Sequence, residues 1–222
     1  MAEESRNLSK SDLKEDQFLE WVLEAVEYVK ERRQYFIGGV VVIILAVVGV
    51  NLLIDQQEQA KVEASQLLGQ ILIAEEEGRA EEGMSMAQRL VDEYAGTPAA
   101  AKGVLLLANR YYNQQRYEEA RSLYQGYLDS YEPVDVLVFG AWNGLAACLA
   151  AEEKWDQAAA KYQQYAQTHS GTQQSAYALW QAAQCYKAMG NTQQQKALLE
   201  QIIRDYAESP LVSRAREEQN ML

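Results

Sequence analysis

The ionisable and nucleophilic side chains of this sequence do not form a catalytic set. Its single histidine, His169, lies in a polar segment where we expect it to be exposed, and no Ser, Cys or Asp is spaced to form a proton relay with it. The acidic run Glu75–Glu77 is more simply a solvated helix end than a cation site. No Gly-rich phosphate loop, HExxH motif or paired-cysteine metal spacing occurs. The sequence therefore predicts a protein that is not an enzyme and uses no cofactor or metal.

The two cysteines are predicted to be small core residues. Cys148 and Cys185 lie 37 residues apart, at equivalent places in adjacent helical units. Adjacent helix axes lie about 8–10 Å apart, whereas a disulfide requires Cα atoms within about 7 Å. Burial as free thiols is the favoured interpretation, and a bridge in an oxidising compartment stays an alternative.

The composition predicts an all-α fold. The chain has 222 residues, of which 48% are hydrophobic and only 3 are proline. Outside one apolar block, the dominant residues are Ala, Gln, Glu and Leu, which form helices well. The formal net charge of -12 argues against nucleic acid as a partner, because phosphate binding needs a basic surface.

The apolar block, residues 35–54, is predicted to be a transmembrane helix. Its only ionisable group is the phenol of Tyr35, and its length suffices to cross about 30 Å of hydrocarbon. No small-residue cleavage pattern follows it, so we expect an uncleaved anchor in the inner (plasma) membrane. Lys30, Arg32 and Arg33 precede the block, whereas Lys61 alone follows it closely. This asymmetry places the N-terminus in the cytoplasm and residues 55–222 on the extracytoplasmic side, which is the periplasm in a Gram-negative bacterium.

Two further segments precede the block. Residues 1–11 are predicted to be a disordered tail. Residues 12–34 carry apolar side chains at helical spacing opposite glutamates, which predicts an amphipathic juxtamembrane helix. Trp21 could anchor this helix at the bilayer interface. Contact with a protein partner is the alternative, because the polar face is acidic.

Residues 55–222 contain internal repeats with starts about 37–38 residues apart. Each places small residues where the two helices of a hairpin would touch, and bulky residues in the adjoining gaps. Gln195 departs from this pattern, since alanine is expected there. The first unit is degenerate, with helices near 56–77 and 83–95. The matching positions of the three good units are Val104, Leu107, Ala108, Tyr111, Ala120, Tyr124 and Pro133; Trp142, Leu145, Ala146, Leu149, Ala158 and Tyr162; and Leu179, Ala182, Ala183, Tyr186, Leu199 and Pro210.

On these positions, residues 60–215 resemble a tetratricopeptide repeat (TPR) domain. The resemblance implies an α-solenoid of three good repeats and one degenerate repeat. The layout as a whole, with a cytoplasmic tail, one span and an extracytoplasmic repeat domain, is similar to the ancillary subunit family of the bacterial SecYEG translocon. That family's repeat domain meets secreted proteins and periplasmic chaperones.

The TPR resemblance implies a concave groove that binds an extended peptide or a partner helix. Asparagine amides could pair with a peptide backbone, and aromatic side chains could act as anchors; Trp180 and the tyrosines could instead fill gaps between repeats. Too few lysines accompany the asparagines for a carboxylate clamp. Projected onto the sequence, the groove is formed by Lys102, Leu105, Asn109, Tyr112, Gly140, Asn143, Ala147, Tyr177, Trp180, Gln184 and Lys187.

The sequence is compatible with two functions. The first is a membrane-anchored scaffold that binds client proteins near the export channel. The second is a fixed structural subunit of a larger membrane complex. Protein partners and the bilayer are expected in both cases, and the oligomeric state is left undetermined.

Overall fold

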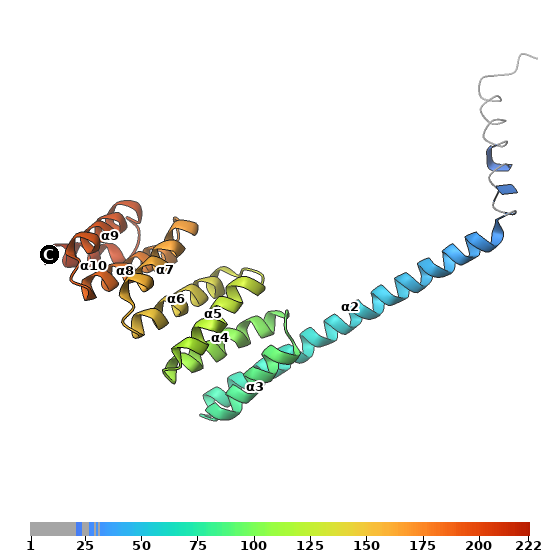
Figure 1. Cartoon of the computed structure of the whole chain (residues 1–222), viewed down its shortest axis with the longest axis horizontal. Helices are drawn as coiled ribbons and strands as arrows, with labels where there is room; N and C mark the ends of the chain where they lie inside the picture. The colour runs from blue at the N-terminus through green and yellow to red at the C-terminus, as the bar shows by residue number, and fades with distance from the viewer. Residues whose placement is uncertain (1–20, 24–26, 29, 31) are drawn as a thin grey trace, which may run out of the picture. The chain divides into compact units, whose positions relative to one another are not determined.

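The computed structural model describes residues 21–23, 27, 28, 30 and 32–222, and the chain divides into two units, residues 1–58 and residues 59–222 (Figure 1). The predicted tail, residues 1–11, and much of the predicted juxtamembrane helix, residues 12–34, lie outside the described part. All regular elements of the described part are helices. The prediction of an all-α fold with a helical solenoid is confirmed.

Helix α2 (Arg33–Glu76) contains the predicted span and continues as the first helix of the repeats. Every side chain described between Ile37 and Ile54 is exposed except at Gly49, which is half-buried. Among the described residues this is the one helix long and apolar enough to cross a membrane. We expected a separate repeat helix to begin near residue 56. It does not, because residues 55–61 contain no Pro or Gly and residues 56–61 are good helix formers.

The repeat unit is a series of helical hairpins. Each helix packs against the next along the chain from α3 to α10. The helices are α3 (Ala80–Glu93), α4 (Pro98–Asn113), α5 (Tyr117–Ser130), α6 (Asp135–Ala151), α7 (Trp155–Thr168), α8 (Gln173–Ala188), α9 (Thr192–Asp205) and α10 (Leu211–Gln219).

The even-numbered helices form the inner layer of the solenoid. Helix α4 approaches α6, α6 approaches α8, and α8 approaches α10 with Cα atoms within 8 Å, whereas within residues 80–219 no two odd-numbered helices come that close. When successive helices lie closer together in one layer than in the other, the stack of hairpins curves so that the closely spaced layer is on the inside. The even-numbered helices therefore line the concave side.

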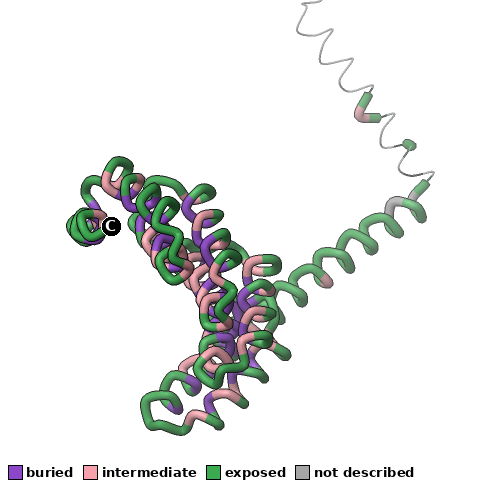
Figure 2. The backbone as a smooth tube through the Cα atoms, turned by 60° about the vertical axis from the view of Figure 1, so that its left-hand side comes forward, coloured by how far each residue is buried: buried purple, intermediate pink, exposed green. Residues whose placement is uncertain are grey.

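The core lies between the two layers, where Figure 2 shows the buried backbone positions. The alanines at the helix contacts are fully buried, including Ala108, Ala146 and Ala182. The tyrosines of the outer layer fill the gaps beside them, with Tyr124 2% and Tyr162 5% exposed. Small residues let the helices approach closely, and each ring then fills the space that the approach leaves.

The turn inside each hairpin uses a residue in the left-handed region. These residues are Gly78, Gln115, Glu153 and Gly190, with φ between 60° and 74°. They recur at the spacing of the repeats, so all four hairpins share one turn geometry. Gln115 and Glu153 adopt a conformation that is unfavourable for residues with a Cβ.

Both cysteines are free and buried, as the sequence predicted. Burial in an apolar environment raises the pKa of Cys148 to about 12 and that of Cys185 to about 11. The thiols therefore stay protonated at neutral pH and serve as small core residues.

Candidate functional site

The concave layer positions most of the predicted groove residues. Helices α4 and α8 begin at threonine caps, since Thr97 Oγ1 accepts a hydrogen bond from Ala100 N and Thr172 Oγ1 accepts one from Ser175 N, both at 3.1 Å. Such caps fix where each helix starts and therefore which residues face the groove.

Asn109 is exposed on α4, and one side of its amide is already engaged. Tyr124 Oη donates to Asn109 Oδ1 at 2.6 Å, and burial raises the pKa of Tyr124, so the phenol remains a donor. This bond orients the amide and leaves its Nδ2 group to donate to a ligand. Asn109 is therefore a preorganised donor on the concave side.

Helix α6 contributes the middle of the concave layer. Gly140, Asn143 and Ala147 are half-buried there. Asn143 Oδ1 is shielded from solvent and has no hydrogen-bond partner within the described chain. An unpaired amide oxygen of this kind costs about 1–3 kcal/mol, and because it is shielded from solvent it is not accessible to a ligand in this structure.

The aromatic groove residues differ in exposure. Tyr177 is 39% exposed, and it packs edge-on against Phe139 with ring centroids 5.8 Å apart. Tyr112 is half-buried and meets Tyr117 edge-on at 5.5 Å. Trp180 is half-buried and packs on the core. Tyr177 is thus the most accessible of the predicted aromatic groove residues, while Trp180 is partly buried against the core.

The C-terminal helix occupies one end of the predicted groove. Glu218 of α10 is 6% exposed, and its carboxylate accepts from Gln184 Nε2 at 3.0 Å, Lys187 Nζ at 2.7 Å and Gln195 Nε2 at 2.9 Å. This network explains why Gln195 replaces the alanine of the repeat pattern. In this structure Gln184 and Lys187 bind α10, the C-terminal helix, which we call the cap helix.

Two predicted groove residues at the α4 end differ from each other in accessibility. Leu105 is buried, with Leu105 Cδ1 beside Gly140, so it belongs to the core and not to the surface. Leu105 faces α6 as well as the groove. It is buried because α4 and α6 lie close together at this point. Lys102 is exposed at the start of α4.

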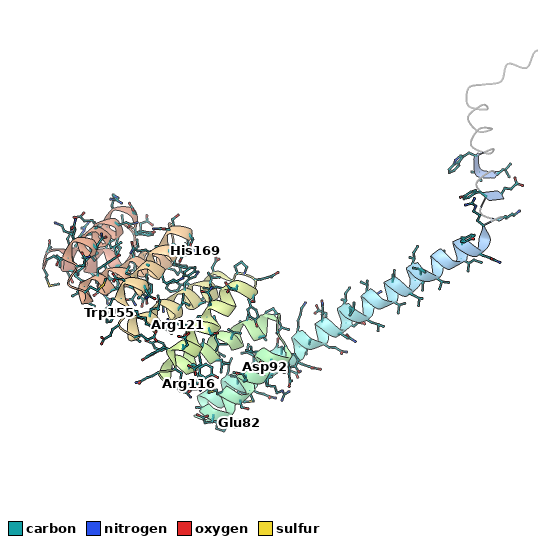
Figure 3. All side chains as sticks on the ribbon, in the orientation of Figure 1. Glu82, Asp92, Arg116, Arg121, Trp155 and His169 are labelled. Carbon is teal, nitrogen blue, oxygen red and sulfur yellow. The ribbon has the colours of Figure 1, made fainter. Side chains whose placement is uncertain are left out.

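The ionisable groups do not converge on a second site. His169, expected to be exposed, is half-buried at the end of α7 and stacks on Tyr165 at 4.4 Å. Figure 3 shows it far from Glu82 and Asp92. In the part of the chain that the structure describes, no group of three His, Cys, Asp or Glu side chains is placed to hold a metal ion.

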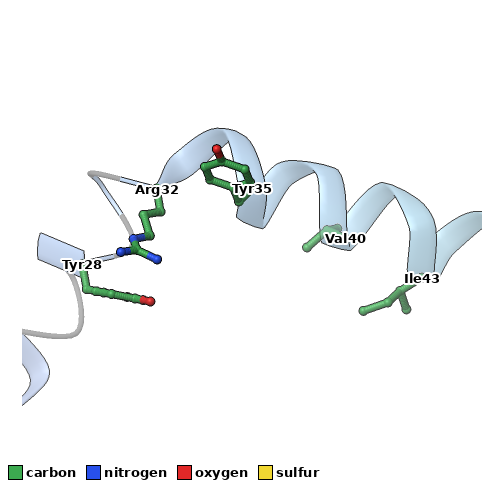
Figure 4. A pocket seen from close by; sticks show the side chains of 6 residues that line it. Tyr28, Arg32, Tyr35, Val40 and Ile43 are labelled. Atoms are coloured by element: carbon green, nitrogen blue, oxygen red, sulfur yellow. The ribbon is translucent and has the colours of Figure 1, made fainter.

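The residues just before α2 and its first turns carry a separate aromatic and cationic cluster within residues 1–58 (Figure 4). An open depression of about 790 Å³ is lined by Tyr28, Arg32, Tyr35 and three apolar residues of the helix. The Arg32 guanidinium lies 4.9 Å from the centre of the Tyr28 ring. Tyrosine and arginine at the edge of an apolar helix are typical of a membrane interface.

Comparison with known proteins identifies the repeats. The family model of the tetratricopeptide repeat-like domain matches residues 27–164, and the tetratricopeptide repeat model matches residues 177–209. The chain belongs to the tetratricopeptide repeat-like family. TPR domains generally bind protein partners, and the matched models indicate no enzymatic family.

A solved structure shows the same fold. It is the Q17M variant of a Podosopora anserina protein with nearly identical TPR-like repeats, assigned as a kinesin light chain. The TM-score is 0.51 at 15% identity, over 68% of this chain and 77% of that chain. At this identity the similarity concerns the TPR fold alone. No curated protein matches the sequence.

Proposed function

We propose that this TPR protein is a membrane-anchored scaffold that binds client proteins on its concave face. The observation that carries the proposal is the pair of accessible groups on α4 and α8. The exposed Asn109 amide is held in position by Tyr124, and Tyr177 is 39% exposed on α8. An amide that can pair with a peptide backbone, together with an aromatic anchor in the same layer of helices, suits an extended polypeptide.

The anchor is the apolar part of α2, residues 35–54. Its exposed valines, leucines and isoleucines would be unfavourable in water and are favourable in lipid. The tyrosines and arginine of Figure 4 lie where the bilayer interface would meet the helix. The excess of Lys and Arg before the span supports a cytoplasmic N-terminus and an extracytoplasmic repeat domain.

This arrangement supports a role near the protein-export channel. A scaffold that is fixed in the inner membrane and faces the extracytoplasmic side would meet secreted and envelope proteins as they emerge unfolded. The resemblance of the layout to the ancillary SecYEG subunit family is consistent with that role.

Site-specific photo-crosslinking in intact membranes tests the proposal. A photoreactive residue replaces Tyr177 on the concave face, and a second probe replaces Val22 before the span. A matched control replaces Gln164, which is exposed on α7 in the outer layer. We expect many different exported proteins to crosslink to the Tyr177 probe and few to the Gln164 probe.

The same experiment examines the alternative of a fixed structural subunit. The apolar side chains of Val62 and Ile73 on α2 are 57% and 52% exposed, which favours some permanent contact on that helix. A single stoichiometric partner captured from Val22, with no clients captured from Tyr177, would refute the scaffold proposal and support the alternative.

A further inference from the structure

Two of the junctions between hairpins share a turn and a cap that the junction between α5 and α6 lacks. After α3 the chain runs Tyr94-Ala95-Gly96-Thr97, and after α7 it runs His169-Ser170-Gly171-Thr172. Gly96 and Gly171 have φ of 82° and 83°. In both junctions the threonine then caps the next helix. Both junctions therefore combine a glycine in the left-handed region with a threonine hydroxyl that caps the next helix.

The junction between α5 and α6 has neither feature. Pro133 occupies the glycine position and Val134 occupies the threonine position. Proline is restricted to a φ near −65°, so it cannot adopt the left-handed turn. Valine has no oxygen to accept a hydrogen bond, and α6 begins with no side-chain cap. The junction instead exposes two valines, Val134 at 54% and Val136 at 69%.

A cleft of about 600 Å³ lies beside these valines. The preceding junction and the start of α4 form one side of it, and the α5–α6 junction forms the other. Its volume falls within the range of about 300–1,000 Å³ that is usual for ligand pockets. We refer to it as the junction cleft, and its lining includes Pro98, Lys102, Tyr131, Glu132, Val134 and Val136.

One carboxylate and one ammonium group line the junction cleft, and two more carboxylates adjoin the lining residues in the sequence. Glu132 lines it, and Asp129 and Asp135 are exposed next to it in the sequence. Lys102 is the one cation among the lining residues. Apolar walls beside carboxylates complement a ligand that carries an apolar group next to a positive charge.

We propose that the junction cleft binds an extended peptide segment in which a large apolar side chain is flanked by Lys or Arg. Val134, Val136 and Tyr131 contact the apolar side chain, and Glu132 and Asp135 attract the cationic neighbours. Lys102 donates to backbone carbonyl groups of the peptide. The inference rests on the proposed function, because it specifies which segment of a client the scaffold recognises.

The folding of the repeats does not by itself require this junction. The glycine and threonine found in the α3–α4 and α7–α8 junctions would satisfy the turn and the cap, and would leave no exposed valine. Departures from such local rules are expected at functional or strained sites. An apolar and uncapped junction beside a cleft fits that description.

Peptide binding to the full chain in lipid nanodiscs tests the proposal. The probe is a fluorescein-labelled peptide, Gly-Ser-Lys-Phe-Arg-Ser-Gly, and its partner carries Ser in place of Phe. Binding is measured by fluorescence anisotropy for the natural chain and for Val134→Ser/Val136→Ser. The control is Val62→Ser, which changes an equally exposed valine on α2. Circular dichroism verifies that each variant is folded.

We expect the Phe peptide to bind at least 10-fold more tightly than the Ser peptide. The double valine variant should lose that difference, and the control should retain it. We also expect Glu132→Gln/Asp135→Asn to weaken binding and to reduce its salt dependence.

Equal binding of the two peptides, no binding of either, or undiminished binding to the double valine variant would overturn the inference. If Tyr177→Ala abolishes peptide binding while the double valine variant does not, the peptide binds to the concave face and not in the junction cleft. If the junction cleft binds the probe but the Tyr177 crosslinker captures no clients, the proposed function fails while the cleft stands.

Discussion

Replacing Gly144 by alanine tests the close packing between the two helix layers. A Cβ on Gly144 would lie 2.5 Å from Tyr124 Cε1 and 2.6 Å from Tyr124 Cε2, and closer still to Tyr124 Cζ. Carbon atoms normally pack about 3.5–4.0 Å apart. The ring cannot move freely, because Tyr124 is 2% exposed and bonded to Asn109. The substitution therefore forces either the ring or helix α6 to shift.

The magnitude follows from three contributions. Overpacking a core costs about 1–3 kcal/mol, and loss of the Tyr124–Asn109 hydrogen bond adds about 0.5–1.5 kcal/mol. Alanine recovers about 1 kcal/mol of helix propensity relative to glycine. We therefore expect the free energy of unfolding to fall by about 2 kcal/mol.

Urea unfolding of the full chain in non-ionic detergent, followed by circular dichroism, measures the change. Gly126→Ala is the matched control, because Gly126 is also helical but has no atom within 4 Å of an added Cβ. That variant should be about 0.5–1 kcal/mol more stable than the natural chain. In Gly144→Ala/Tyr124→Leu, removal of the ring should offset part of the penalty, so the two changes should couple by about 1 kcal/mol or more.

Equal stability of Gly144→Ala and Gly126→Ala would refute the reasoning. Strict additivity of the Gly144 and Tyr124 changes would also contradict it, since the proposed cause is a contact between these two residues.

Three other predictions concern the junction, the cap helix and the thiols. Val134→Thr should supply the missing cap of α6 and raise the free energy of unfolding by about 1 kcal/mol; an unchanged urea midpoint would contradict this. Glu218→Ala should leave the buried amide of Gln195 unsatisfied, lower stability by about 1–3 kcal/mol and accelerate hydrogen exchange in α10; unchanged exchange there would show that the network does not hold the helix. Cys148 and Cys185 should resist an aromatic disulfide reagent at pH 8 until the chain unfolds, and rapid labelling of the folded chain would contradict their burial. Because their folded-state pKa values of about 12 and about 11 exceed the usual value of about 8.5, the thiols of the unfolded chain lose protons first, and stability should fall as the pH rises from about 9 to 11.

The repeat architecture could be predicted from the sequence because its signal is local. Ala108, Ala146 and Ala182 recur at a fixed place in each unit, and their burial follows from the spacing of two helices in one hairpin. The tyrosines Tyr124 and Tyr162 follow the same rule. Contacts within one hairpin therefore fix the phase of the repeats.

The state of individual groove residues depends on contacts between distant parts of the chain. Lys187 and Gln184 have polar side chains suited to a groove, but their partner Glu218 lies more than 30 residues away. Leu105 is buried because α6 approaches α4 closely there. One signal was visible, since Gln195 broke the repeat pattern, but the sequence did not show which group required the amide.

Hydrogen–deuterium exchange with an unfolded client tests the central claim most directly. The full chain in nanodiscs is compared with and without reduced, carboxymethylated α-lactalbumin, which serves as a model of an extended client. If the concave layer binds clients, amide exchange should slow in α4, α6 and the first half of α8, while α5 and α7 remain unchanged. Unchanged exchange in the even-numbered helices, or equal slowing in both layers, would contradict the assignment of the concave face as the client-binding site.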